Sequence, residues 1–164
     1  MIEIERKFLI VSDKYKELAY KKTRILQGFL NTHKERTVRV RIKGEKAFIT
    51  IKGISNSKGT TRFEWEKEIS LKEAEQLIEL CEPNLIEKIR YEIKVGNHIF
   101  EVDEFSAENE GLIIAEIELS EENESFDKQI GLEKKLQEIS GTIILNYASY
   151  LIKIGAFNFR KLKT

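Results

Sequence analysis

The sequence predicts an α+β fold in which about eight long strands close into a barrel, and two patterns carry this prediction. First, apolar and polar residues alternate with a period of two along most of the chain, which is typical of strands that bury one face. Second, the polar face of almost every strand is charged, with both signs present. Because eight strands can enclose one small ligand, these faces are expected to line a wet tunnel. The alternative is a flat sheet with a solvated charged face. This alternative becomes less favoured because the charged face recurs in strand after strand.

Strands are expected over seven regular segments and one less regular segment. In the first segment, Glu3, Glu5 and Lys7 share one face, and apolar residues occupy the other. The same alternation places Arg39 and Arg41 between β-branched residues. In chain order, the expected strands are 2–10, 24–31, 36–43, 46–52, 61–69, 86–95, 98–104 and 114–119, of which 24–31 is the least regular.

Helical signals lie between and after these strands. Ser70 followed by Glu73 has the spacing of a capping box, so it predicts a helix over 71–81 that ends near Pro83. Further helices are expected over 13–20 behind Ser12 and Asp13, after Ser120, along a stripe of Leu132, Leu136 and Ile139, and over 143–154. If the charged faces point inward, several such helices are needed to cover the apolar outer faces of the barrel.

The composition narrows the class of protein. A chain of 164 residues, 41% of them hydrophobic, is expected to form one domain over 1–164 with a real core. Basic and acidic residues both number 28, and a net charge of zero disfavours a basic nucleic-acid binder. A single cysteine, Cys81, excludes an internal disulfide and a Cys-based zinc finger. The charged opening residues, and the lack of an apolar run of roughly 20 residues, predict a soluble cytoplasmic protein.

The charged faces supply a balanced set of candidate site residues. Charges inside a barrel are costly to dehydrate unless they pair, bind metal or bind a polyanion, so a structural salt-bridge network would give the same set. In the functional interpretation, carboxylates hold Mg²⁺ or Mn²⁺ while Arg and Lys bind phosphate oxygens. The cations are Lys7, Arg39, Arg41, Lys52, Arg62, Lys88 and Arg90, and the carboxylates are Glu3, Glu5, Glu64, Glu66, Asp103, Glu116 and Glu118.

Several motifs follow one another along the chain and together resemble a known family. The opening E-I-E-R-K, which contains Glu3, Glu5 and Lys7, matches an ExExK signature. The later motifs are R-V-R with Arg39 and Arg41, I-T-I-K with Lys52, R-F-E-W-E with Arg62, Glu64 and Glu66, K-I-R-Y with Lys88 and Arg90, E-V-D with Asp103, and A-E-I-E-L with Glu116 and Glu118. From residue 2 to about residue 120, the chain is similar to CYTH proteins, the triphosphate tunnel metalloenzymes.

The resemblance implies an eight-stranded antiparallel tunnel that binds a triphosphate compound together with a divalent metal. Family activities include inorganic triphosphatase, thiamine-triphosphatase, RNA triphosphatase and adenylate cyclase, and short bacterial members like this one resemble inorganic triphosphatases. Two positions depart from the family pattern. Phe29 stands where a tyrosine is common, and the segment from Thr142 to Tyr147 lacks the usual arginine. These departures concern substrate identity and rate more than metal–phosphate binding.

The expected activity is metal-dependent hydrolysis of inorganic tripolyphosphate. In-line phosphoryl transfer needs mainly positioning and charge neutralisation. The expected catalytic group comprises Lys7, Lys88, Glu64 and Glu66, in which the two carboxylates ligate or orient the attacking water. Phosphate oxygens would be bound by Lys7, Arg39, Arg41, Lys52, Arg62, Lys88 and Arg90. One or two Mg²⁺ or Mn²⁺ ions would be held by Glu3, Glu5, Asp103, Glu116 and Glu118.

Two other functions stay open at this point. A non-catalytic polyphosphate- or nucleotide-binding module would use the same charges, and an adenylate cyclase would use the same tunnel. The expected partner is a small triphosphate compound, with no specific nucleic acid and no membrane. The chain is expected to be a monomer or a homodimer, because an apolar strip along 143–157 could serve a dimer or pack on the barrel.

Overall fold

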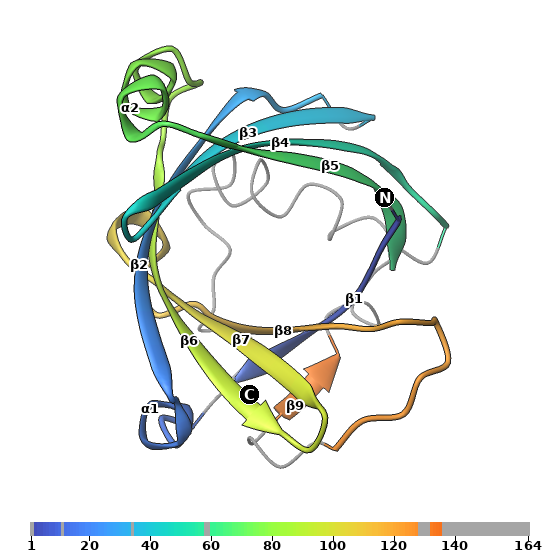
Figure 1. The fold of residues 1–164 in the computed structure, drawn as a ribbon. Helices are drawn as coiled ribbons and strands as arrows, with labels where there is room; N and C mark the ends of the chain where they lie inside the picture. The colour runs from blue at the N-terminus through green and yellow to red at the C-terminus, as the bar shows by residue number, and fades with distance from the viewer. Residues whose placement is uncertain (1, 11, 34, 58–59, 128–131, 136–164) are drawn as a thin grey trace.

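The computed structural model describes residues 2–10, 12–33, 35–57, 60–127 and 132–135, and eight strands of this part form a closed barrel (Figure 1). All neighbouring strands are antiparallel, in the order β5-β4-β3-β2-β6-β7-β8-β1. The bounds are β1 Ile2–Ile10, β2 Lys21–Asn31, β3 Arg36–Lys43, β4 Lys46–Ser55, β5 Thr61–Ile69, β6 Ile86–Val95, β7 His98–Phe105 and β8 Ile113–Glu118. The predicted barrel and its eight strands are confirmed. The strand expected over 24–31 is three residues longer at its start.

The barrel closes where the first strand meets the fifth. Residues Ile2–Ile4 of β1 pair with residues 61–63 of β5, and β5 then leaves this edge. A short strand, β9 (Leu132–Lys135), occupies the rest of the edge and pairs with Phe8 and Ile10. The helical stripe predicted from Leu132 is therefore wrong over 132–135, because the unpaired backbone groups of β1 accept another strand. Leu136 and Ile139 lie outside the described residues.

Fewer helices cover the barrel, in the described part of the chain, than the sequence predicts. α1 spans only Tyr15–Leu18 instead of 13–20, because the chain turns early into β2 and Tyr20 N–H already donates to the Glu92 carbonyl at 3.1 Å. Residues 121–127, the described stretch directly after Ser120, form no helix, since the Glu124 carboxylate accepts from both the backbone N–H and the hydroxyl of Ser120 and closes a turn. The helix predicted over 143–154 lies outside the described residues.

The helix predicted from the capping box is confirmed. α2 spans Leu71–Glu79, and Ser70 Oγ accepts from Glu73 N–H at 3.2 Å while Ser70 N–H donates to the Glu73 carboxylate at 2.8 Å. It ends two residues before the expected position. A single 3₁₀ turn, η1 (Ala107–Asn109), joins β7 to β8.

The apolar faces of the strands point outward, and the helices cover part of them. α1 packs Tyr15 edge-on against Tyr91 of β6, with ring centroids 5.1 Å apart. α2 buries Ala74 against Val40 and Ala47 on the outer face of β3 and β4. The core therefore lies outside the barrel wall, which leaves the lumen free for the charged side chains. No helix in the described part is long and apolar enough to cross a membrane.

Candidate active site

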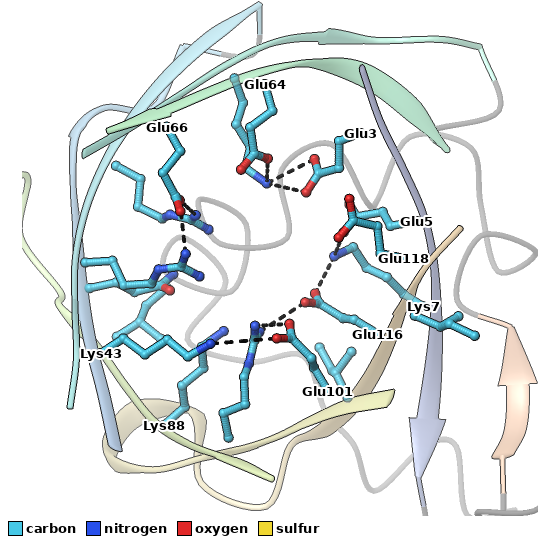
Figure 2. Close-up of a pocket in the computed structure, with 18 of the residues that line it drawn as sticks. Glu3, Glu5, Lys7, Lys43, Glu64, Glu66, Lys88, Glu101, Glu116 and Glu118 are labelled. Carbon is cyan, nitrogen blue, oxygen red and sulfur yellow. Dashed lines mark hydrogen bonds and ion pairs between the residues drawn. The ribbon is translucent and has the colours of Figure 1, made fainter. Parts of the chain in front are cut away.

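Side chains from strands all round the barrel enclose one cavity of about 690 Å³ (Figure 2). Successive side chains of a strand point to opposite faces, so every second residue enters the lumen. The register then brings together residues that are far apart in the sequence: Lys7 lies opposite Glu116, and Glu5 lies opposite Glu118. All the site residues predicted from the sequence line this cavity except Asp103.

Lys7 lies among the carboxylates of β1 and β8. Its ammonium donates to Glu5 at 3.0 Å and also to Glu116 (Figure 2). Burial by itself would lower the pKa of Lys7, but the carboxylates of Glu116 and Glu5 outweigh it and hold the pKa above its ordinary value. Lys7 therefore remains a cation at neutral pH in the middle of an acidic wall.

A second ion-pair cluster spans the seam between β1 and β5. Glu3 accepts from Lys52 at 2.9 Å and from Arg62 Nε at 2.7 Å, and Arg62 Nη2 also donates to Glu5 at 3.1 Å. Burial would raise the pKa of Glu3, but Lys52 and Arg62 outweigh it and hold the pKa well below its usual range. Because these groups come from β1, β4 and β5, they meet only when the barrel closes.

Glu118 differs from the other carboxylates of the acidic wall formed by β1 and β8. It forms no ion pair with any residue of the described part, and it lies directly across from Glu5. Burial raises the pKa of Glu118, and the nearby carboxylates of Glu3, Glu101 and Glu5 raise it further. Like charges opposite each other in a sheet are destabilising, so this corner of the cavity favours a cation.

The donor chemistry of the acidic wall fits a divalent metal ion. Mg²⁺ and Mn²⁺ prefer carboxylate oxygens, which this wall offers from Glu3, Glu5, Glu116 and Glu118. Across the described ranges, no three His, Cys, Asp or Glu side chains already stand close enough together to hold an ion. The reason is that all but Glu118 turn toward Lys or Arg. A bound cation would take over carboxylates that these basic groups now hold.

The opposite wall, which we call the β3 wall, is formed by β3, β4 and β5. The positive charge of its arginines is only partly neutralised by nearby carboxylates. Arg41 and Arg39 share Glu66, at 3.0 and 3.5 Å. The Nε atoms of both arginines are buried, and no described residue accepts a hydrogen bond from them. Burial, followed by repulsion from Arg41, lowers the pKa of Arg39 to about 10. An anion in the cavity would relieve both the repulsion and the missing hydrogen bonds.

A third group of cations lies on β6, where Lys88 and Arg90 both bind Asp103 of β7. Lys88 Nζ is 2.5 Å from Asp103 Oδ2, and Arg90 Nε and Nη2 are 2.7 and 2.6 Å from the two carboxylate oxygens. Burial outweighs the attraction of Asp103, and Arg90 adds repulsion, so the pKa of Lys88 falls to about 8. Asp103 is only 1% exposed and does not line the cavity.

Several polar lining residues are absent from the set predicted from sequence. The alternation places Lys43 and Glu92 on the charged faces, but they belong to no motif, and only the closed barrel shows that they face the same cavity. Gln27 is buried, and its Oε1 has no hydrogen-bond partner among the described residues. The additional polar lining residues include Lys21, Gln27, Lys43, Glu92 and Glu101.

The structure is thus a closed antiparallel tunnel with a carboxylate wall on β1 and β8 and buried arginines on β3 across one cavity. The family model of the CYTH domain matches residues 1–151. The chain therefore belongs to the CYTH domain family, as the motifs along β1 to β8 suggest.

Two relatives cover most of this chain. An inorganic triphosphatase of Acetivibrio thermocellus is 47% identical over 127 residues, which are 77% of this chain and 80% of the relative. An inorganic triphosphatase of Nitrosomonas europaea is 34% identical over 125 residues, which are 75% of this chain and 80% of that protein.

Solved structures have the same fold. The crystal structure of the inorganic triphosphatase NE1496 matches with a TM-score of 0.57 at 25% identity, covering 89% of this chain and 93% of the other. The PH1012 protein from Pyrococcus horikoshii OT3 matches with a TM-score of 0.60 at 21% identity, covering 91% and 89%.

Proposed function

We propose that this chain is a divalent-metal-dependent triphosphatase that hydrolyses inorganic tripolyphosphate in its tunnel. The observation that carries the proposal is the β3 wall, where Arg39 and Arg41 are buried with unused Nε donors across one cavity from the carboxylates of β1 and β8. A triphosphate carries several negative charges and many acceptor oxygens, and it could accept from these Nε donors, which Glu66 leaves unused. The two relatives named inorganic triphosphatase support the same substrate.

In the proposed substrate complex, the basic side chains and the carboxylates take separate parts. Phosphate oxygens bind to Lys7, Arg39, Arg41, Lys52, Arg62, Lys88 and Arg90, and a Mg²⁺ or Mn²⁺ ion is held by Glu3, Glu5, Glu116 and Glu118. The ion supplies charge neutralisation and Lewis acidity when it is bound. Asp103 was also predicted as a ligand, but it does not line the cavity, and Lys88 and Arg90 use both of its oxygens. We therefore assign it to positioning these two cations.

Hydrolysis then needs a water molecule in line with the terminal phosphorus. The water oxygen bonds to this phosphorus while the bond to the bridging oxygen breaks, and pyrophosphate leaves with the bonding electrons. Glu64 or Glu66 accepts the proton of the water. Burial raises the pKa of Glu64, and although Lys52 lowers it, the neighbouring Glu3 adds to the rise. A carboxylate with a raised pKa is a better proton acceptor near neutral pH. Lys7 and Lys88 neutralise the charge that develops on the phosphate oxygens.

A substrate panel tests the proposal. Phosphate release is measured from tripolyphosphate, ATP and thiamine triphosphate, each with Mg²⁺, with Mn²⁺ and with EDTA, and cyclic AMP is measured from ATP. We expect metal-dependent release of phosphate, fastest from tripolyphosphate. Binding without release under either metal would identify a binding module instead, and cyclic AMP formation would identify a cyclase.

Lys7→Ala and Glu5→Ala test the site itself. We expect kcat of each variant to fall by a factor of about 10²–10³, which is typical for the loss of one group that stabilises the transition state. Circular dichroism must show that both remain folded. Folded variants with unimpaired turnover would refute the assigned site. Metal preference, oligomeric state and cytoplasmic location stay predictions.

A further inference from the structure

Lys43 is the third inward-facing cation on β3, after Arg39 and Arg41, and it belongs to none of the motifs (Figure 2). Its side chain lines the cavity and is 23% exposed. Residues on one face of a strand repeat about every 6.6 Å, so the three cations form a row roughly 13 Å long. Lys43 thus continues the row beyond the two buried arginines.

The partners of Lys43 are distant and already engaged. Its Nζ is 3.7 Å from Glu92 and 3.8 Å from Glu101, beyond hydrogen-bond distance. Lys21 binds the same oxygen of Glu92 at 3.0 Å, and Arg90 binds Glu101 directly. Within the described part of the chain, the ammonium of Lys43 therefore donates no hydrogen bond. A cation that served only to neutralise these carboxylates would be expected to approach them more closely.

A lysine ammonium has three donors on a flexible stem, so Lys43 can turn into the cavity without breaking a hydrogen bond to the protein. We propose that Lys43 binds a phosphate oxygen of the substrate and extends the phosphate-binding row of β3. This inference rests on the proposed function of the same tunnel. It makes Lys43 a substrate-binding residue of the ground state, with little part in the chemical step.

Lys43→Met tests this role. We expect KM for tripolyphosphate to rise about tenfold to a hundredfold, the range for one hydrogen bond to a charged group, while kcat stays within about twofold. Lys43→Arg is expected to restore most of the affinity because it keeps the charge. Lys46→Met is the matched control: Lys46 is exposed, pairs with Glu68 at 3.2 Å and does not line the cavity.

Calorimetric binding of tripolyphosphate in EDTA, where metal-dependent turnover is prevented, separates this inference from the proposed function. Weaker binding to Lys43→Met than to Lys46→Met supports the inference whether or not the wild type hydrolyses the compound. Equal binding to both variants, with an unchanged KM, overturns it. A variant that loses thermal stability and kcat but keeps its affinity overturns it too, because Lys43 would then be structural. Absence of phosphate release from the wild type refutes the proposed function alone.

Discussion

The two basic walls of the tunnel hold their cations in different ways. On the β6–β7 wall, Lys88 and Arg90 converge on one carboxylate, Asp103, at 2.5 to 2.7 Å. On the β3 wall, the Nε donors of Arg39 and Arg41 are buried, and no residue of the described part accepts a hydrogen bond from them. The first wall is built around an internal anion, whereas the second has hydrogen-bonding capacity left over. Changes in the first wall should therefore affect folding most, and changes in the second should affect substrate most.

Asp103→Ala tests the first half of this comparison and has the largest expected effect. It leaves Lys88 and Arg90 buried without their shared carboxylate, so we expect the free energy of unfolding to fall by about 3–5 kcal/mol, the range for breaking a buried ion pair. Urea denaturation of the purified variant measures the loss. A loss below about 1 kcal/mol would mean that water reaches these cations and that the wall is not internally compensated.

Arg39→Met tests the second half. We expect kcat/KM for tripolyphosphate to fall by about 10²–10³, since one cation is missing from the transition state. The free energy of unfolding should stay the same or rise, because burial and Arg41 already lower the pKa of Arg39 to about 10 and its charge is unfavourable in the folded state. Urea denaturation and steady-state kinetics on one preparation give both quantities. A variant that is less stable and fully active would reverse the comparison.

The period-two pattern predicted most of the charged residues that enter the tunnel, but it also placed Asp103 there and gave no reason to select Lys43 or Glu92. It did not predict how the charges pair. It places Arg90 and Asp103 on charged faces, yet their pairing follows from the β6–β7 register, which no motif encodes. The difference between the two walls could not be predicted for the same reason. The local pattern also gave a wrong prediction at residues 132–135. These residues pair with the free edge of β1 instead of forming a helix.

The outer face shows the same limit of sequence reasoning. Alternation places Phe63, Trp65 and Tyr91 on the apolar side of their strands and predicts packing for all three. Tyr91 is buried under Tyr15 of α1, but Phe63 and Trp65 remain 55% and 43% exposed. Helix placement decides which part of an apolar face is covered, and the strand pattern holds no information about it.

The pH dependence of catalysis should show the smallest effect and should sharpen the comparison. The pKa of Lys88 is lowered to about 8, chiefly by burial, so its ammonium loses the proton as pH rises through this value. We expect kcat/KM of the wild type to fall about tenfold between pH 7 and pH 9, since the cationic form declines by that factor. Tripolyphosphate itself titrates, so the reference is Lys88→Arg, which keeps its charge throughout this range. The ratio of kcat/KM of the wild type to kcat/KM of Lys88→Arg should fall as pH rises. A ratio that stays constant would show that Asp103 keeps Lys88 charged and that positive charge on the β6–β7 wall is fully compensated.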